Sequence, residues 1–433
     1  VDWIIRCIIL FLKKILVLQI NFKVVMNKSS LLLFITICTL LVACSSPVKQ
    51  QRSVTAEPVQ KAHKHKHQSL ANGTLSLDII KHQGKLHLLK GTHQHGEKAL
   101  WYQSSDDQGK NWTAAVNINN SKPIDANLSR GNDARLAVQG NNIVAIWASR
   151  VEGAPHNAGP MKTARSADGG KSWQKTAIPA DWAKGPHAFY AMDGNDQSIN
   201  VVWLDSRNGQ SSVKASQGMR FSQSKDGGQS WSSNKTLDNI TCACCWNTAK
   251  FDSNNHFYLL YRDKQPTDMA IGVLNQDQQW QRLSSVGAFN WDFPGCPHIG
   301  GGLAFQEDAG LMHSVIGSGH MEHLGVHYLR SNNKGKTWSA PVQLGDESSI
   351  HADIASAENG RVIAVWDMRT EDGLAIFYAE SNDSGLSWSE SKRLSKPGMR
   401  ATHPRIISTD TGFLTLWTES ATGKTQALKM QTL

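Results

Sequence analysis

The chain has 433 residues, of which 40% are hydrophobic and 19% are charged, a composition typical of a folded globular protein with a substantial core. Its formal net charge is +9, but residues 1–43 carry five of the Lys and Arg residues and one Asp, which leaves +5 for the remainder. Such a mild basic excess gives no support for nucleic-acid binding. Gly (35) and Trp (15) are plentiful, which favours short strands joined by tight turns.

The first 70 residues differ in pattern from the rest. Residues 1–25 are apolar and basic and precede a candidate start at Met26, so we interpret them as an extension from an over-long reading frame, with a second membrane segment as the alternative. Residues 26–43 have a charged beginning, an apolar run and a small residue before Cys44, the pattern of an export signal. The segment Leu41-Val42-Ala43-Cys44 resembles the bacterial lipobox.

This resemblance implies an exported chain that begins at Cys44 and is anchored to the membrane by a lipid on that residue. Ser45 follows the Cys, and the lack of Asp there favours, by similarity to lipoprotein sorting, the outer membrane of a Gram-negative-type envelope. A transmembrane anchor is the alternative, although the apolar run is short for a span. Residues 44–70 are polar and are expected to form a flexible tether. In this tether His63, His65 and His67 alternate with Lys and offer a weak metal site.

A motif of the form Ser-x-Asp-x-Gly-x-x-Trp recurs along the chain, with Asn in place of Asp in one copy. Its five copies begin at Ser105, Ser166, Ser224, Ser331 and Ser381. Successive copies start 61, 58, 107 and 50 residues apart, and the long interval is two periods with a degenerate copy from Asp277 to Trp280. A near-regular period of this length indicates a repeated supersecondary unit.

Each period has the same order of elements. A short apolar first strand is followed by a turn, a second strand that runs into Trp or Tyr, a loop, and a third strand that ends at the Ser of the motif. The motif is a tight turn, in which Gly supplies backbone freedom and Asp or Asn binds nearby N–H groups, and its Trp begins a fourth strand. Four antiparallel strands per unit, repeated in a ring, predict an all-β fold, a β-propeller of four-stranded blades over residues 71–433.

Seven blades are predicted, and six with a partial terminal repeat are the alternative. The predicted first strands begin near Leu75, Ala134, His187, Thr248, Gly301, Asp353 and Pro404. The last unit reaches Leu433 without a motif or a fourth strand. Residues 53–70 are therefore expected to supply that strand and close the ring.

The motifs and the strand order resemble those of the sialidase-like propellers, whose repeats are called Asp-boxes or BNR repeats, over roughly residues 72–433. In that family the boxes lie on the rim, away from the active site. The resemblance therefore implies a structural role for the boxes of this chain.

The resemblance also implies a candidate activity, the hydrolysis of sialic-acid-like or other acidic sugars. Sialidases hold the substrate carboxylate with an arginine triad and use an acid Asp and a Tyr nucleophile paired with Glu. This chain lacks the Arg-Ile-Pro strand signature, and its nearest matches are Arg135 and Arg405 on first strands. Asp133 is the candidate acid and Tyr190 the candidate nucleophile. The departure from the family pattern leaves open whether the protein is an enzyme.

Histidine and cysteine residues are expected to collect on one face of the ring. The face on which first strands begin also carries the loops between second and third strands, whereas the Asp-box turns lie on the opposite face. Imidazole and sulfur at the mouth of a rigid channel are typical of a metal site, and this ligand set favours copper, with zinc as the alternative. The candidate ligands are His187, Cys242, Cys244, Cys245, Cys296, His298, His320, His323, His351 and His403.

Four of these ligands stand where first strands begin, so we expect them to converge on a common point at the ring axis. They are His187, His298, His351 and His403. Two further segments, Asp205-Ser206-Arg207 and Asp367-Met368-Arg369, follow the Trp of a second strand and predict ion pairs or loop anchors, with a rim for an anionic ligand on the site face as the alternative.

Three functions are therefore consistent with the sequence. The first is a lipid-anchored propeller whose axial His/Cys site binds copper in a binding or redox role. The second is a sialidase-like hydrolase in which Arg135 and Arg405 hold the carboxylate of a small acidic ligand. The third is a noncatalytic envelope scaffold that binds another protein and whose cysteines form disulfides, for example between the 242–245 cluster and Cys296, as exported proteins commonly do.

Overall fold

A computed structural model describes residues 72–433 of the chain, except residues 121, 151–158, 208–212, 214–215, 296 and 423. These residues belong to a compact unit, Ser69–Leu433. The predicted export signal, the lipid site at Cys44, the tether, the strand from residues 53–70 and Cys296 all lie outside the described residues. In the part of the chain that the structure describes, no helix is long and apolar enough to cross a membrane.

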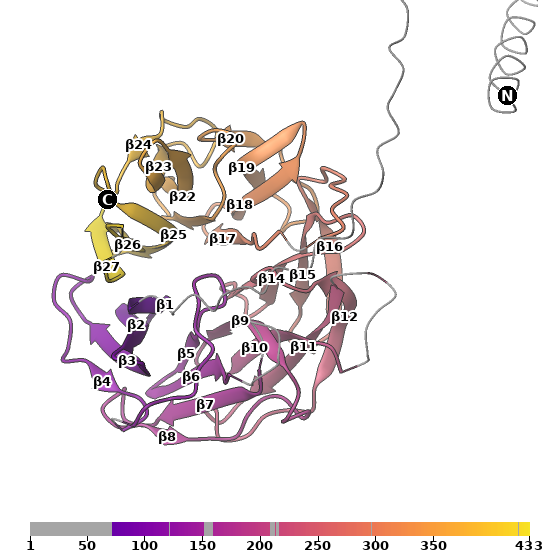
Figure 1. The fold of residues 1–433 in the computed structure, drawn as a ribbon. Helices are drawn as coiled ribbons and strands as arrows, with labels where there is room; N and C mark the ends of the chain where they lie inside the picture. Colours follow the sequence, from indigo (N-terminus) through magenta and orange to yellow (C-terminus); the bar gives the residue numbers. More distant parts are fainter. Residues whose placement is uncertain are drawn as a thin grey trace, which may run out of the picture. The chain divides into compact units, whose positions relative to one another are not determined.

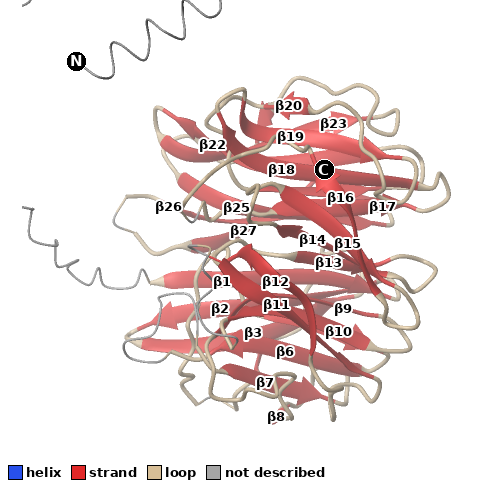
Figure 2. Ribbon diagram, turned by 90° about the vertical axis from the view of Figure 1, so that its right-hand side faces the viewer, coloured by secondary structure: helices blue, strands red, loops and turns tan. Residues whose placement is uncertain are grey.

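The described residues form an all-β propeller of seven sheets (Figures 1 and 2). The first four sheets comprise β1 (Gly73–His82), β2 (Lys85–Gln94), β3 (Glu97–Ser105) and β4 (Val116–Asn117); β5 (Arg135–Gln139), β6 (Asn142–Ala148), β7 (Met161–Ser166) and β8 (Gln174–Lys175); β9 (His187–Gly194), β10 (Ile199–Asp205), β11 (Ser216–Ser224) and β12 (Lys235–Cys242); and β13 (Thr248–Phe251), β14 (Phe257–Arg262), β15 (Met269–Leu274) and β16 (Trp280–Val286).

The other three sheets comprise β17 (Gly301–Gln306), β18 (Leu311–His320), β19 (His323–Ser331) and β20 (Val342–Leu344); β21 (Ala352–Ser356), β22 (Val362–Thr370), β23 (Gly373–Ser381) and β24 (Lys392–Arg393); and β25 (Arg400–Thr409), β26 (Gly412–Ser420) and β27 (Ala427–Thr432). The prediction of seven blades is therefore confirmed. The seventh sheet has three strands among the described residues.

The first strand of each blade is the innermost one, and these strands contact one another in order around the ring. Strand β1 contacts β5, and the series continues through β9, β13, β17, β21 and β25 back to β1 (Figure 1). Strands β9, β13 and β17 begin at the predicted residues, and the largest shift is in the last blade, where β25 begins four residues before Pro404. A bulge between Thr402 and Arg405 lets this strand extend beyond the position of the proline.

Contacts between the first and last blades close the ring. The backbone N–H of Thr74 donates to the carbonyl of Gln426 (2.8 Å). On the opposite face, Lys81 pairs with Asp410 at 2.6 Å, and the Asp410 side chain also accepts from Gln108 Nε2 at 2.7 Å. Apolar side chains from both blades fill the space between these contacts, with Leu77 and Leu86 packed against Leu414 and Leu416.

The Asp-box turns share one hydrogen-bond pattern. In the first box, Ser105 Oγ donates to Asp107 Oδ1 (2.8 Å) and accepts from the N–H of Gly109 (2.9 Å), and Asp107 Oδ1 accepts from the N–H of Asn111 (2.8 Å). Backbone and side-chain hydrogen bonds from Asn111 lower the pKa of Asp107 to about 2. The degenerate copy forms a turn without this Ser–Asp pair, and the amide oxygen of Asn275 accepts from the N–H of Gln279 instead (2.8 Å).

Candidate functional site

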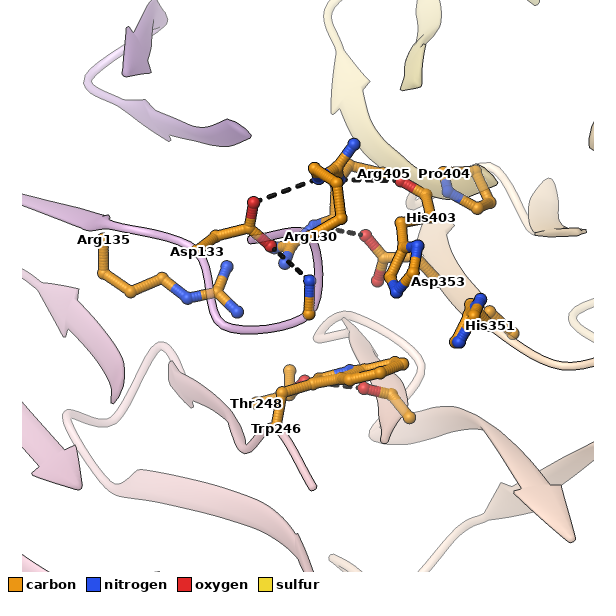
Figure 3. A pocket seen from close by; sticks show the side chains of 13 residues that line it. Arg130, Asp133, Arg135, Trp246, Thr248, His351, Asp353, His403, Pro404 and Arg405 are labelled. Carbon is orange, nitrogen blue, oxygen red and sulfur yellow. Dashed lines mark hydrogen bonds and ion pairs between the residues drawn. The ribbon is translucent and has the colours of Figure 1, made fainter. Parts of the chain in front are cut away.

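The face on which the innermost strands begin is called the mouth face below. A pocket opens there near the ring axis, where loops of the second and fourth blades meet the first strands of the fifth, sixth and seventh blades (Figure 3). It is lined by Arg130, Gly131, Asp133, Arg135, Trp246, Thr248, Gly301, His351, Ala352, Asp353, His403, Pro404 and Arg405. A cavity of about 460 Å³ adjoins it along the channel and shares Arg135, Thr248, Asp353 and Arg405 with it.

His351 and His403 lie side by side in this pocket. Their ring centroids are 3.7 Å apart and their planes differ by 18° (Figure 3). They come together because His351 directly precedes β21 and His403 lies in β25, the innermost strands of neighbouring blades. Of the four histidines predicted to converge at the axis, His351 and His403 meet, whereas His187 and His298 do not join them.

One buried carboxylate orients both imidazoles. Asp367 Oδ2 lies 2.7 Å from His351 Nδ1 and accepts from Thr402 Oγ1 (2.6 Å) and from the N–H of His403 (2.9 Å). Because the Thr402 hydroxyl donates to Asp367, its lone pair accepts from His403 Nδ1, 2.8 Å away. Both rings therefore carry a proton on Nδ1, and Nε2 of each takes no part in this network.

The charge states of the network follow from burial and proximity. Burial alone would raise the pKa of Asp367. The charge and the hydrogen bond of His351, the charge of His403 and the hydrogen bond from Thr402 outweigh burial and hold this pKa well below its usual range. Burial lowers the pKa of His403 well below 6.5, and the neighbouring His351 lowers it further. His403 is therefore an uncharged imidazole at neutral pH, beside a permanent carboxylate.

Trp246 and Gly131 shape the pocket around the histidines. The Trp246 ring lies 5.4 Å from the His351 ring and 5.8 Å from the His403 ring. Gly131 has a left-handed φ of 89°, and a Cβ at this position would lie 3.3 Å from His403 Nε2 and 3.4 Å from Trp246. Glycine at this position therefore keeps space beside the Nε2 atom.

Three arginines approach the pocket, and each lies near at least one carboxylate. Arg130 donates to Asp133 Oδ1 (3.0 Å) and to the carbonyl of His403 (2.8 Å). Arg135 donates to Asp78 Oδ1 (3.0 Å) and to the carbonyl of Tyr190 (3.1 Å). These contacts give both residues structural roles, because they tie the second blade to the first, third and seventh blades.

Arg405 differs because part of its side chain is accessible. That side chain is 25% exposed, against 6% for Arg130 and Arg135. Its Nε lies 3.1 Å from Asp353 Oδ2, an ion pair without the alignment of a hydrogen bond, and its Nη2 lies 3.7 Å from Asp78 Oδ1. Burial opposes its charge, but Asp353 and Asp78 raise the pKa of Arg405, so it stays cationic.

Two of the predicted catalytic residues are engaged in the core. Tyr190 is 1% exposed, its hydroxyl donates to the carbonyl of His187 (3.3 Å), and burial raises its pKa well above 10. Asp133 accepts from Arg130, from the N–H of Leu77 (2.8 Å) and from the N–H of Gly131 (3.1 Å). These contacts give both side chains structural roles.

The predicted metal ligands fall into separate groups. In the described residues, three groups place candidate ligand atoms within 4.8 Å of one another: Cys242, Cys244 and Cys245; His320, Glu322 and His323; and His351, Asp367 and His403. His187 and His298 are in none of these groups. His187 is buried between Trp182 and Trp203, and its Nδ1 accepts from the N–H of Met161 (3.1 Å), whereas His298 is exposed.

The group at the turn between β18 and β19 is partly solvent-exposed. The rings of His320 and His323 lie 5.7 Å apart, and His323 stacks on Phe289 at 4.2 Å. The group at the end of β12 is buried: Cys242, Cys244 and Cys245 are at most 3% exposed. Burial and the neighbouring Cys242 raise the pKa of Cys245 to about 12.

Sequence reasoning missed the role of Asp367. The sequence groups it with Asp205 as a residue after a second-strand Trp, and Asp205 does anchor a loop through Arg207 (2.7 Å) and Arg220 (3.0 Å). Asp205, however, stands two residues after Trp203 and accepts from its indole (3.0 Å), whereas Asp367 stands one residue after Trp366. Both carboxylates lie opposite the first-strand histidine of their own blade, Asp205 opposite His187 and Asp367 opposite His351, and a bulge between Val202 and Leu204 accounts for the different distance from the Trp.

The Asp-box turns and the seven-bladed ring are those expected of a sialidase-like β-propeller, and solved structures are similar to this fold. An ulvan lyase of polysaccharide lyase family PL25, bound to -[GlcA(1-4)Rha3S]-, has a TM-score of 0.55 and 11% identity over 84% of this chain and 94% of that chain. A Hadza microbial sialidase has a TM-score of 0.47 and 13% identity, over 77% and 73% of the two chains.

A mutant of the NanB sialidase from Streptococcus pneumoniae has a TM-score of 0.44 and 12% identity, over 80% and 65% of the two chains. No family model and no curated protein matches the chain. At such low identities, the similarity to the solved structures establishes the fold alone.

Proposed function

We propose that the mouth-face pocket binds a saccharide that carries a carboxylate and cleaves it by removing the proton next to that carboxylate. The supporting observation is the pair of imidazoles held by Asp367 beside Arg405. A neutral imidazole is a suitable base at neutral pH, and an arginine is a suitable partner for a carboxylate.

Arg405 would hold the substrate carboxylate through the exposed end of its guanidinium, and Trp246 would provide an apolar wall for the sugar ring. Neutralising the carboxylate makes the adjacent carbon–hydrogen bond more acidic. The side chain of His351 is 14% exposed, and its Nδ1 bonds the Asp367 carboxylate directly, whereas His403 Nδ1 reaches that carboxylate through Thr402. His351 is therefore assigned as the base.

The step balances as a β-elimination. His351 Nε2 takes the proton from the carbon that bears the carboxylate, and that bonding pair forms a carbon–carbon double bond as the glycosidic carbon–oxygen bond breaks. The leaving oxygen takes a proton from water at the mouth. Asp367, hydrogen-bonded to Nδ1, stabilises the imidazolium that forms.

Elimination is favoured over sialidase-type hydrolysis because the side chains that could serve as nucleophile and acid are already hydrogen-bonded. Hydrolysis needs a nucleophile and an acid near the sugar. The hydroxyl of Tyr190 is buried, and the carboxylate of Asp133 accepts three hydrogen bonds. The ulvan lyase of similar fold is bound to a saccharide that contains glucuronate, which is consistent with a substrate of this class.

The experiment measures formation of the unsaturated uronate by ultraviolet absorbance, with -[GlcA(1-4)Rha3S]- oligosaccharides as one substrate and a fluorogenic sialoside as the comparison. We expect turnover of the uronate and a loss of about 100-fold or more in kcat for His351→Gln. His320→Gln is the matched control, because it removes a mouth-face imidazole outside the pocket, and it should leave the rate unchanged. Equal loss in both variants, or turnover of the sialoside alone, would contradict the proposal.

We also propose that the protein is exported and anchored through a lipid on Cys44, which the lipobox-like segment before that residue supports. Cys44→Ala should release the protein from the membrane fraction. Retention of this variant in the membrane would contradict the lipid anchor.

A further inference from the structure

A hairpin turn in the fifth blade brings three candidate metal ligands together, apart from the saccharide pocket (Figure 1). His320 ends β18 and His323 begins β19, and the two residues pair directly across the strands. Met321 and Glu322 form the turn between them. One ligand atom from each of His320, Glu322 and His323 lies within 4.8 Å of the other two.

The hairpin and its packing hold these side chains in place. Strands β18 and β19 pair in one continuous register from Met312 and Ser331 up to His320 and His323. The His323 ring stacks on Phe289, with centroids 4.2 Å apart and planes 20° apart, and it lies 5.7 Å from the His320 ring. Rigid strands and a packed ring favour ion binding, because the ligands are already positioned.

One hydrogen bond in the turn shows the state of His320. Its Nδ1 accepts from the backbone N–H of Glu322 at 3.3 Å, so this nitrogen carries a lone pair. A neutral imidazole with a free lone pair is the form that binds a metal ion. The hydrogen bond is long, so a metal ion would replace a weak contact.

A further histidine lies beside the group, on the same face of β19. His327 is 4% exposed, and its ring lies 5.8 Å from that of His323. Among the described residues, its Nδ1 has no hydrogen-bond partner. Buried polar atoms are nearly always hydrogen-bonded, so this atom indicates that the site accepts a further polar group. Water on a bound ion would supply that group.

We propose that His320, Glu322 and His323 bind Zn(II), with water as the fourth ligand. Two His, one Glu and a water form an established tetrahedral arrangement for this ion. A carboxylate in place of sulfur disfavours Cu(I), which prefers thiolate and thioether ligands, and two imidazoles disfavour Mg(II) and Ca(II), which prefer oxygen. The pocket lining contains none of the three residues, so the site is separate from the proposed cleavage.

The test uses the full chain in a reference form in which Gln replaces His63, His65 and His67, because these tether histidines offer a weak metal site of their own. Zn(II) binding is measured by equilibrium dialysis against chelator-buffered zinc. The imidazole resonances of His320 and His323 are followed by NMR. No saccharide is present, so the result does not depend on the proposed function.

We expect His320→Gln and His323→Gln each to bind one zinc ion fewer per chain than the reference. Glu322→Gln should weaken binding about 100-fold or more, because loss of a direct ligand costs more than loss of an outer partner. Zinc should also shift the resonances of both histidines. It should raise the melting temperature of the reference, which checks the site without any substitution at the turn.

The matched control is His95→Asn, which removes an imidazole from the corresponding turn of the first blade, between β2 and β3. Asn tolerates the left-handed φ of 50° at this position. This variant should bind as much zinc as the reference. Equal zinc content in the reference and His320→Gln, unshifted histidine resonances, an unchanged melting temperature, or displacement of zinc by Mg(II) would each overturn the proposal.

Discussion

At the scale of single residues, the pocket depends on one carboxylate and one small residue. Asp367 fixes the proton positions of His351 and His403, directly in one case and through Thr402 in the other. Gly131 leaves the space beside His403 Nε2 unfilled. Nε2 of His403 thus keeps space beside it, in a pocket whose other polar groups are mostly paired.

A substitution at Gly131 tests this arrangement. Gly131→Ala should lower kcat/KM at least about tenfold, because a small misplacement of reacting groups is costly in rate. Gly84→Ala is the matched control: its φ is 78°, similar to the 89° of Gly131, but no atom lies within 4 Å of the added Cβ. Each variant should lose about 1–2 kcal/mol of stability from backbone strain.

Kinetics and thermal unfolding of both variants check this prediction. If Gly131→Ala and Gly84→Ala had the same rate, the space beside His403 would be irrelevant to activity.

At the scale of the elements, the Asp-boxes join the blades that carry them to the blades before them. The box glycine of a blade packs on the preceding blade: Gly170 on Tyr102, Gly228 on Val144 and Gly385 on Tyr328. In the first blade, Gly109 meets Leu414 of the last blade, so the same contact closes the ring. The boxes thus serve as packing elements as well as turns.

Gly385→Ala should therefore destabilise the fold strongly. A Cβ there would lie 1.7 Å from Tyr328 Oη, at a φ of 83°. We expect a loss of about 3 kcal/mol or more in the free energy of unfolding, from overpacking added to strain. Gly398→Ala, with a φ of 75° and no atom within 4 Å of its Cβ, should lose only about 1–2 kcal/mol.

Denaturant unfolding of the two variants makes the comparison. Equal losses would mean that the box glycines are required for their backbone conformation alone.

The sequence predicts the elements better than it predicts the pocket, for physical reasons. The Asp-box and the alternation of apolar and polar residues along a strand are patterns within a few residues, so the sequence alone specifies seven blades. They also place His351 and His403 at the first strands of adjacent blades, which meet at the ring axis. His187 occupies a similar place in the third blade, yet its ring turns into the core between Trp182 and Trp203. Trp246 and Arg130 enter from loops, whose paths depend on contacts that no repeat specifies.

At the scale of the whole molecule, ring closure brings together loops and strands that are far apart in sequence, and it also buries histidines. Burial lowers the pKa of His87, His187 and His313 to about 4, from 6.5. Between about pH 4 and pH 6.5, the unfolded chain therefore binds more protons than the folded chain. The stability that these buried histidines contribute is therefore fully present above pH 6.5 and is lost as the pH falls toward about 4.

His313→Gln should reduce this acid sensitivity. His313 Nδ1 lies 2.7 Å from Tyr328 Oη, a contact that Gln can replace without titrating. One pKa unit corresponds to 1.36 kcal/mol, so the variant should lose about 2 kcal/mol less stability than the wild type between pH 7 and pH 5. Urea unfolding at the two pH values measures the difference, and parallel losses would mean that His313 is not buried in its neutral form.

The central claim, that the mouth-face pocket cleaves a carboxylate-bearing saccharide by elimination, is tested most directly by the mass of the product. The protein is incubated with -[GlcA(1-4)Rha3S]- oligosaccharides, and the new non-reducing end is analysed by mass spectrometry. Elimination predicts an unsaturated uronate, lighter by one water than the product of hydrolysis, and no such product from Arg405→Gln. A product with the mass of a hydrolysed saccharide, or an unsaturated product formed equally by Arg405→Gln, would contradict the account.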